Sequence, residues 1–369
     1  GAWYQFEVWR RFTDVQLPRR SVVARVLWRD AAGKPVLWDT QAPAGYARGQ
    51  MPRAEPEYPV DDGSPAGQWG KVAMRLQAPP QARMAVVELY LQWAAGGQVA
   101  WSGVKLEPMA APGPRRVRLA TVHFRPKEGK EAAEKVALFE PLVAQAAQQR
   151  ADLVVLPESL TYYGTGRTYA ECAEPVPGPS TKALGEMAKR HHCYLVAGLL
   201  EREGEVCYNT AALIAPDGSL AGKYRKVCLP RSEIEGGLTP GSEYPVFDTP
   251  WGRVGMMICY DGFFPEVARQ LKNAGAEVIA WPVWGCNPLL GRARACENQV
   301  YLVSSTYTDA KDDWMVSAVF DPWGQILGQC QDWGTVSVTE VDLNARPRWA
   351  SLGNFGDQLP AHRPPAVGE

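Results

Sequence analysis

Hydrophobic and polar residues alternate along this chain with two different periods, and the change between them falls near residue 111. Before that point the alternation has period two, which is typical of strands with one buried face. In residues 84–93 the apolar face of such a strand is formed by Ala85, Val87, Leu89, Leu91 and Trp93. Further strands are predicted at Val22–Trp28, Lys71–Leu76 and Val99–Leu106. Several strands without a helical segment predict an all-β, jelly-roll-like sandwich over residues 1–111.

After a linker rich in proline and glycine, Met109–Arg116, strands alternate with helices. Helices are predicted at Lys130–Arg150 with an interruption at Pro141, and at Thr181–His191, Glu266–Ala274 and Leu290–Asn298. Strands are predicted at Val117–Phe124, Asp152–Leu156, Tyr194–Leu200, Val206–Ala215, Leu220–Val227, Val254–Ile258, Val278–Val283, Tyr301–Thr306, Ser317–Phe320 and Thr335–Val341. This alternation predicts an α/β domain over residues 116–343. Residues 344–369 have little period and several prolines, so we expect an extended arm that packs on another surface, such as a partner subunit.

Composition limits the possible partners. The chain has 369 residues, 46% of them hydrophobic, which suffices for two domains with sizeable cores. A net charge of -1 without a charged block does not favour nucleic acid or an anionic membrane as partner. No apolar run reaches the roughly 18 residues of a membrane-spanning helix. The chain begins at Gly1 and directly enters a strand-like segment, so we expect it to be truncated at its N-terminus, and its compartment stays open.

The eight cysteines all lie after residue 171 and contain no Cys-x-x-Cys pair. No cysteine and histidine cluster has the spacing of a zinc site, so we expect no metal site and mostly reduced, buried thiols. The sandwich domain is instead rich in tryptophan. Its tryptophans either fill the core or, where exposed, stack on the faces of sugars, which makes a glycan a possible partner of this domain.

One cysteine stands where a fold can present a nucleophile. Val254–Ile258 predicts a buried strand, Cys259 follows it at once, and a helix is predicted soon after. A sharp turn from strand to helix lifts a side chain out of the sheet and directs the next backbone N–H groups toward a developing oxyanion. The alternative is a cysteine that packs as a small hydrophobic residue. The chain has only four histidines, none in the context of a thiol's partner, so a catalytic Cys259 needs another base.

Two further strand ends supply the missing chemistry. Glu158 follows Leu153–Leu156 and a proline, where a desolvated carboxylate can take a thiol proton. Lys226 lies in another strand-like segment, shortly before Pro230, and its ammonium can stabilise a thiolate or an oxyanion. Each residue alone is typical of a solvated surface. Three such residues, each at the end of an apolar strand, together indicate a catalytic site.

In this order, Leu-Pro-Glu158, Tyr-Arg-Lys226 and Cys259-Tyr-Asp261 resemble the Glu-Lys-Cys triad of the nitrilase superfamily, the carbon-nitrogen hydrolases. Tyr208-Asn209-Thr210 and Phe320-Asp-Pro-Trp-Gly324 are similar to further segments of that family. The resemblance implies a four-layer αββα sandwich and assembly into homodimers or larger homo-oligomers. It implies hydrolysis without a metal or organic cofactor.

The resemblance also assigns roles. Glu158 is expected to be the general base, Lys226 the stabiliser of the oxyanion, and Cys259 the nucleophile that forms a thioester. The backbone N–H of Tyr260 is expected to be a second oxyanion donor. Family members often carry a further glutamate after the lysine, for which we choose Glu235 over Glu233.

The nucleophile segment reads Cys-Tyr-Asp-Gly-Phe-Phe, which resembles the amidase and carbamoylase branches. We therefore predict hydrolysis of a small non-peptide linear amide, with release of ammonia or an amine. The alternatives are hydrolysis of an N-carbamoyl amine or amino acid, and a catalytically silent carbohydrate-binding or scaffold protein. Aromatic residues near strand ends are expected to line the substrate pocket, namely Tyr162, Tyr163, Phe263, Trp281 and Trp284.

Overall fold

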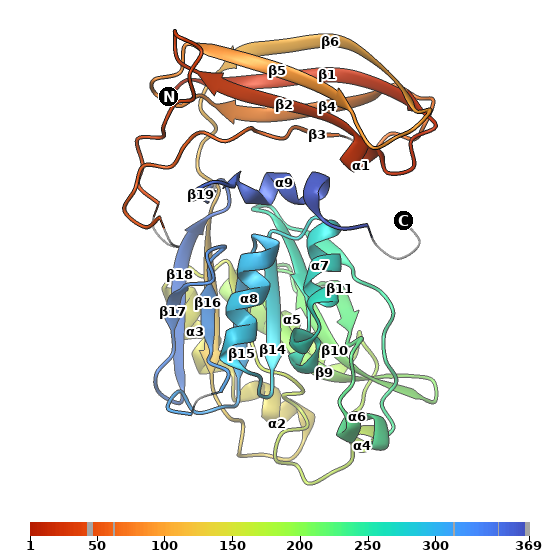
Figure 1. Cartoon of the computed structure of the whole chain (residues 1–369). Coiled ribbons are helices and arrows are strands. Elements are labelled where there is room, and N and C mark those ends of the chain that lie inside the picture. The colour runs from red at the N-terminus through yellow and green to blue at the C-terminus, as the bar shows by residue number, and fades with distance from the viewer. Residues whose placement is uncertain (43–46, 62, 313, 346, 366–369) are drawn as a thin grey trace. The chain divides into compact units, whose positions relative to one another are not determined.

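The computed structural model describes residues 1–42, 47–61, 63–312, 314–345 and 347–365. The chain forms two compact units, one of Gly1–Gly113 with Ala345–Glu369 and one of Pro114–Asn344 (Figure 1). The described residues of the segment predicted to be an arm, 344–369, thus lie almost entirely in the unit of the N-terminal strands. Residues 346 and 366–369 of that segment lie outside the described part. No helix of the described residues is long and apolar enough to cross a membrane.

The first unit contains two antiparallel sheets, one of order β3-β4-β1-β6 and one of order β2-β5. Phe6 and Leu76 from the larger sheet pack in one hydrophobic cluster with Val26 and Trp28 from the smaller sheet, so the two sheets share a core. The elements of this unit are β1 (Trp3–Thr13), α1 (Pro18–Ser21), β2 (Val22–Arg29), β3 (Val60–Asp61), β4 (Gly70–Gln77), β5 (Met84–Leu91) and β6 (Gln98–Met109), followed late in the chain by β19 (Arg348–Trp349), β20 (Gly353–Asn354) and α9 (Phe355–His362).

One prediction for this unit is wrong. The period-two pattern placed Trp93 on the buried face of a strand, but β5 ends at Leu91 and Trp93 is 75% exposed. The chain leaves the sheet after Leu91 and turns, with Trp93 in the left-handed region at φ +55°. A periodic pattern does not indicate where a strand ends, because the residues of the following turn can continue the alternation by chance.

The second unit contains two mixed sheets of six strands, of order β11-β10-β9-β8-β7-β18 and β12-β13-β14-β15-β16-β17. The central strands β7, β8 and β9 run parallel, as do β13, β14 and β15. The first sheet is formed by β7 (Arg116–His123), β8 (Leu153–Val155), β9 (Tyr194–Glu203), β10 (Val206–Ile214), β11 (Leu220–Arg225) and β18 (Thr335–Asp342). The second is formed by β12 (Val246–Asp248), β13 (Arg253–Met256), β14 (Val278–Val283), β15 (Tyr301–Thr306), β16 (Ala318–Phe320) and β17 (Ile326–Gln329).

The helices of this unit are α2 (Ala132–Ala137), α3 (Glu140–Gln148), α4 (Tyr169–Cys172), α5 (Pro179–His191), α6 (Arg231–Glu235), α7 (Pro265–Asn273) and α8 (Pro288–Asn298), with the short 3-10 helix η1 (Cys259–Phe263). The predicted helix at Lys130–Arg150 is divided into α2 and α3, and Pro141 lies in the first turn of α3. Proline is tolerated there because it has no backbone N–H to donate, and an N–H in the first turn has no acceptor within the helix.

The α/β unit buries both faces of its first sheet. Leu153 and Val155 contact a cluster that includes Ile279 and Val303 of the second sheet, so the two sheets face each other. Val154, which points the opposite way, packs with Leu184 of α5 on the outer face. Successive side chains of a strand alternate between faces, and burial on both sides explains why Leu153–Val155 is an unbroken apolar run. Figure 1 shows α7 and α8 lying over the second sheet.

Candidate active site

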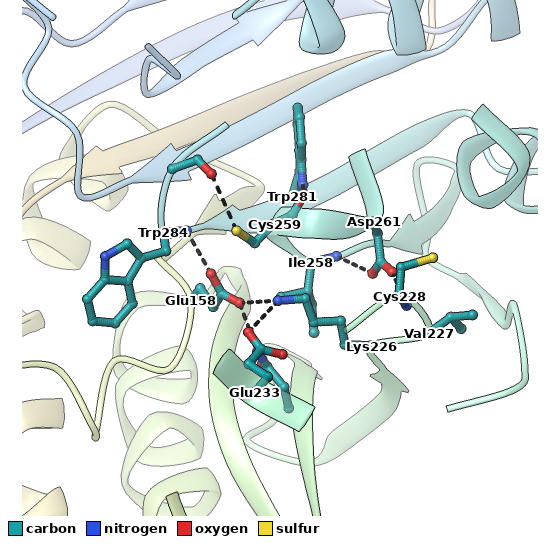
Figure 2. Close-up of polar contacts among 12 residues, drawn as sticks. Glu158, Lys226, Val227, Cys228, Glu233, Ile258, Cys259, Asp261, Trp281 and Trp284 are labelled. Atoms are coloured by element: carbon teal, nitrogen blue, oxygen red, sulfur yellow. Dashed lines mark hydrogen bonds and ion pairs between the residues drawn. The ribbon is translucent and has the colours of Figure 1, made fainter. Parts of the chain in front are cut away.

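Three residues predicted from the sequence lie at strand ends that converge in the α/β unit. Glu158 follows β8, Lys226 follows β11 directly, and Cys259 begins η1 shortly after β13. Figure 2 shows their side chains turned toward one another. Glu158 Oε1 accepts a hydrogen bond from Lys226 Nζ at 2.9 Å. The structure thus brings together side chains that are separated by 68 and 33 residues along the chain.

The Glu158 carboxylate is fixed by donors from three directions. Besides Lys226, Asn209 Nδ2 of β10 donates to Oε1 at 2.8 Å. The backbone N–H of Trp284, just after β14, donates to Oε2 at 2.7 Å. Glu158 is 2% exposed, so these bonds replace the water that a carboxylate otherwise requires. A buried carboxylate held in one orientation beside a thiol can serve as a general base.

Lys226 lies between two carboxylates and is 0% exposed. Its Nζ donates to Glu233 Oε1 at 2.6 Å as well as to Glu158. Burial by itself lowers the pKa of Lys226, but the neighbouring carboxylates, Glu158 foremost, outweigh burial and raise this pKa above its ordinary value. The lysine is therefore a permanent cation in the site.

The choice of Glu235 as the further glutamate is corrected by the structure. Glu235 is 61% exposed at the side chain and pairs with Arg231, whereas Glu233 contacts Lys226. The two residues are two positions apart on α6, so they point to different sides of the helix. Burial raises the pKa of Glu233 to about 7; the Lys226 ammonium opposes this shift, and the Glu158 carboxylate adds to it. Its second oxygen, Oε2, is buried without a hydrogen-bond partner among the described residues.

Cys259 lies in a strained turn. Its φ is +40°, a region that residues with a side chain rarely occupy, and strain of this kind gathers at functional sites. Cys259 Sγ donates to the carbonyl oxygen of Gly285 at 3.5 Å. Burial, and then the nearby Glu158 carboxylate, raises the pKa of the thiol above its ordinary value. The resting thiol is therefore protonated and needs a base before it can attack.

A cavity of about 370 Å³ opens over these groups. Its aromatic walls are Tyr162, Tyr169, Trp284 and Trp314. Tyr162 and Tyr169 lie with their ring centroids 4.7 Å apart. The remaining lining residues are Glu158, Ser159, Pro230, Ser232, Glu233, Cys259 and Gly285.

The family model for the carbon-nitrogen hydrolases matches residues 118–351 of the chain. This chain belongs to the carbon-nitrogen hydrolase family. The match covers the whole set of strand ends that carry Glu158, Lys226 and Cys259.

Individual relatives agree with this membership. The omega-amidase NIT2 of Mus musculus is 37% identical to this hydrolase over 59% of the present chain and 84% of its own length. The omega-amidase NIT2 of Homo sapiens is 34% identical over 60% of the present chain and 85% of its own length. Nit3 of Saccharomyces cerevisiae, a nitrilase-superfamily structure, has a TM-score of 0.54 and 26% identity over 62% of this chain and 90% of its own. An amidase from Nesterenkonia sp. AN1, solved in complex with butyramide, has a TM-score of 0.52 and 26% identity over 61% of this chain and 90% of its own.

The predicted pocket residues of this hydrolase divide into two groups. Tyr162 and Trp284 line the cavity, and the other three do not. Tyr163 packs behind Trp284, and Phe263 is 39% exposed beside Tyr260. Trp281 is 0% exposed, and its Nε1 donates to the Cys259 carbonyl oxygen at 3.2 Å. It therefore supports the Cys259 turn through a hydrogen bond from the buried strand β14. It fails as a pocket residue because β14 is buried on both faces.

Sequence reasoning missed the role of Asp261 in this hydrolase. Its Oδ2 accepts hydrogen bonds from Ile258 N at 2.9 Å and Tyr224 Oη at 2.8 Å, and its Oδ1 accepts one from Cys228 N at 2.8 Å. Figure 2 shows the contacts with Ile258 and Cys228. Asp261 therefore joins the turn that carries Cys259 to the segment that follows Lys226. The residue was visible in the motif Cys-Tyr-Asp, but no local pattern indicates that Tyr224 and Cys228, two of its three partners, come from the end of a strand in the other sheet.

Other contributors had a weaker signal. Asn209 belongs to a motif similar to the family, without an expected role, and Trp314 and Tyr169 had none. The role of the Tyr260 backbone N–H as an oxyanion donor stays a prediction; the ring centroid of Tyr260 lies 5.2 Å from that of Phe263. Among the residues that the structure describes, no group of three or more His, Cys, Asp or Glu side chains could hold a metal ion.

Proposed function

We propose that this chain hydrolyses the carbon-nitrogen bond of a small linear amide through a thioester on Cys259. The observation that carries the proposal is the buried Glu158–Lys226 contact of 2.9 Å beside the Cys259 thiol, at the base of a cavity. The arrangement provides a nucleophile, a base and a fixed positive charge. These are the groups that attack on an amide requires.

In the first half of the reaction Glu158 takes the proton of Cys259 as the sulfur attacks the amide carbonyl carbon. The carbonyl oxygen becomes negative and is stabilised by the Lys226 ammonium and by the backbone N–H of Tyr260. Glu158 then gives the proton to the leaving nitrogen. The carbon-nitrogen bond breaks, ammonia or an amine departs, and a thioester remains.

In the second half a water molecule attacks the thioester carbon. Glu158 takes a proton from this water, and the same oxyanion stabilisers act again. The carbon-sulfur bond breaks, the thiol regains its proton, and the carboxylic acid leaves. The three hydrogen bonds that fix Glu158 allow it to act in both halves from one position, so little reorganisation opposes catalysis.

The cavity favours an uncharged acyl group. Four aromatic side chains and Pro230 offer apolar contact, and the described lining includes the carboxyl groups of Glu158 and Glu233 but no lysine or arginine side chain. A substrate carboxylate would lose its hydration in this cavity, and the described lining offers it no cationic side chain in return, which makes its burial costly. The solved amidase with butyramide binds an uncharged amide, and we extend that preference to this chain.

The test measures ammonia release from a panel of amides, N-carbamoyl compounds and nitriles. Two amides of matched shape, 4-methylpentanamide and succinamate, differ mainly in an isopropyl group against a carboxylate. We expect kcat/KM to be at least about tenfold higher for the uncharged amide. Carbon dioxide released together with ammonia would favour the carbamoyl alternative. Ammonia from no compound of the panel, with the Cys259→Ala variant equal to wild type, would refute the proposal and favour a silent binding protein.

We further propose the four-layer αββα arrangement for the second unit and a jelly-roll-like topology for the first. The first proposal is supported by the shared core of the two six-stranded sheets and by the helices packed on their outer faces. By resemblance to the family, we propose that the chain forms a homodimer or a larger homo-oligomer. Light scattering after size-exclusion chromatography tests this, and a monomer at micromolar concentration would refute it.

A further inference from the structure

Trp93 stands out in the first unit because it is both exposed and strained. It is 75% exposed, and its φ of +55° is rare for a bulky residue. The guanidinium of Arg20 lies over its ring, 5.4 Å from the centroid. By contrast, Trp28 and Trp38 of the same unit are 4% and 5% exposed. An outlier of this kind is typical of positions kept for binding rather than for packing.

A cavity of about 250 Å³ lies beside Trp93, formed by residues of the first unit alone. Its lining residues come in part from α1, β2, β5 and α9, elements labelled in Figure 1. This volume is close to the lower limit of about 300 Å³ for small-molecule sites, so it suits a single ring. The lining residues are Arg20, Val23, Arg25, Tyr58, Tyr90, Gln92, Trp93, Ala361 and His362.

The side chains that form this cavity carry a net positive charge. Arg25 is paired with Glu88 at 2.5 Å and lies over the Tyr90 ring at 4.5 Å. Arg20 has no carboxylate partner among the described residues, and its buried Nε has no acceptor there. Burial, and after it Arg25 and Arg20, lowers the pKa of His362, so this imidazole is mostly neutral near pH 7. The charge of Arg20 therefore remains available for an anionic ligand.

We propose that this cavity binds a carbohydrate ring that carries a carboxylate, such as a uronic acid. A pyranose ring packs in the cavity against the exposed Trp93 indole, with its carboxylate turned toward the Arg20 guanidinium, which lies 5.4 Å from the centroid of that indole ring. The guanidinium of Arg20 binds the carboxylate, a geometry that arginine favours over other cations. Gln92 and Tyr58 provide hydrogen bonds to hydroxyl groups. The site is independent of the proposed hydrolysis, because none of these residues belongs to the α/β unit.

The experiment is isothermal titration calorimetry of the full chain with D-galacturonate, D-galactose and a galacturonate trimer. We expect galacturonate to bind about tenfold more tightly than galactose. A trimer that binds as galacturonate does indicates recognition of one ring, and a tighter trimer indicates a polymer as the source. Absence of heat from all three ligands would overturn the proposal.

The variants Trp93→Ala and Arg20→Gln locate the binding. Trp93→Ala should weaken binding of both monosaccharides about tenfold, and Arg20→Gln should lower the affinity for galacturonate to that for galactose. Trp69→Ala is the matched control, because Trp69 is 41% exposed under Arg11 and lies outside the cavity. If Trp93→Ala does not fold, Arg20→Gln decides alone. Equal losses in the control and in the cavity variants, or no loss in Arg20→Gln, would overturn the assignment.

Discussion

The substitution Asp261→Asn tests how the nucleophile turn is held. The carboxylate accepts three hydrogen bonds, two from the backbone N–H groups of Ile258 and Cys228 and one from the Tyr224 hydroxyl. Asparagine has the same size but only one acceptor oxygen. Its amide NH₂ must face one of the two backbone N–H groups, whichever way the side chain is turned.

The expected loss follows from this geometry. Asp261 is 0% exposed, so the abandoned N–H finds no water, which costs about 1–3 kcal/mol. The remaining hydrogen bonds to residue 261 no longer have a charged acceptor, which weakens each by about 1 kcal/mol. Burial raises the pKa of Asp261, because the charged carboxylate is costly to desolvate. This desolvation cost is absent in the neutral asparagine and offsets part of the loss. We expect a net loss of about 2 kcal/mol in the free energy of unfolding.

Activity should fall further than stability explains. If the amide turns away from Cys228 N, the segment after Lys226 is released from the Cys259 turn, and a displacement near 1 Å can cost about a hundredfold in rate. The assay combines urea unfolding with kcat/KM for ammonia release under conditions where the variant is fully folded. Asp248→Asn is the matched control, because the Asp248 side chain is 87% exposed and pairs with Arg253 on the surface. An Asp261→Asn variant that matches this control in both stability and kcat/KM would refute the reasoning.

Three further predictions concern the site. Cys259→Ala should reduce ammonia release by several orders of magnitude without changing the circular dichroism spectrum, and near-full activity would remove the nucleophile assignment. Glu233 binds protons more strongly in the folded chain, where its pKa is about 7 rather than 4.5, so its contribution to the free energy of unfolding falls as pH rises between these values. Urea unfolding at pH 5 and pH 8 should show that Glu233→Gln removes this dependence of stability on pH and that the control Glu235→Gln keeps it. The same pH dependence in both variants would contradict the placement of Glu233 beside Lys226. Gly198→Ala would bring a Cβ to 2.5 Å from Glu158 Cα, so we expect a lower melting temperature and lower kcat/KM, and wild-type values for both would contradict the packing.

Sequence patterns located most elements of the second unit. The strand predicted at Tyr301–Thr306 matches β15, and the helix at Thr181–His191 matches α5 apart from two residues at its start. These patterns are reliable because each element buries a face of several residues, and each residue contributes to the period. Trp93 shows the limit, since the alternation continued beyond the end of β5.

Side-chain direction was harder to predict than element position. Trp281 points beneath the Cys259 turn rather than into the cavity, and a strand buried on both faces offers no polar residues that distinguish its sides. Glu233 and Glu235 lie on one short helix, and only packing decides which of them meets Lys226.

The sequence by itself determined the family, the alternation of helices and strands in the second unit, and the ends of strands at which Glu158, Lys226 and Cys259 stand. It could do so because these features depend on residue type and local period. Only the tertiary structure decided that Glu233 joins Lys226, that Asp261 ties two strand ends together, and that Trp93 leaves the core. Each of these depends on which face of one element meets another, and that is settled by packing between residues far apart along the chain.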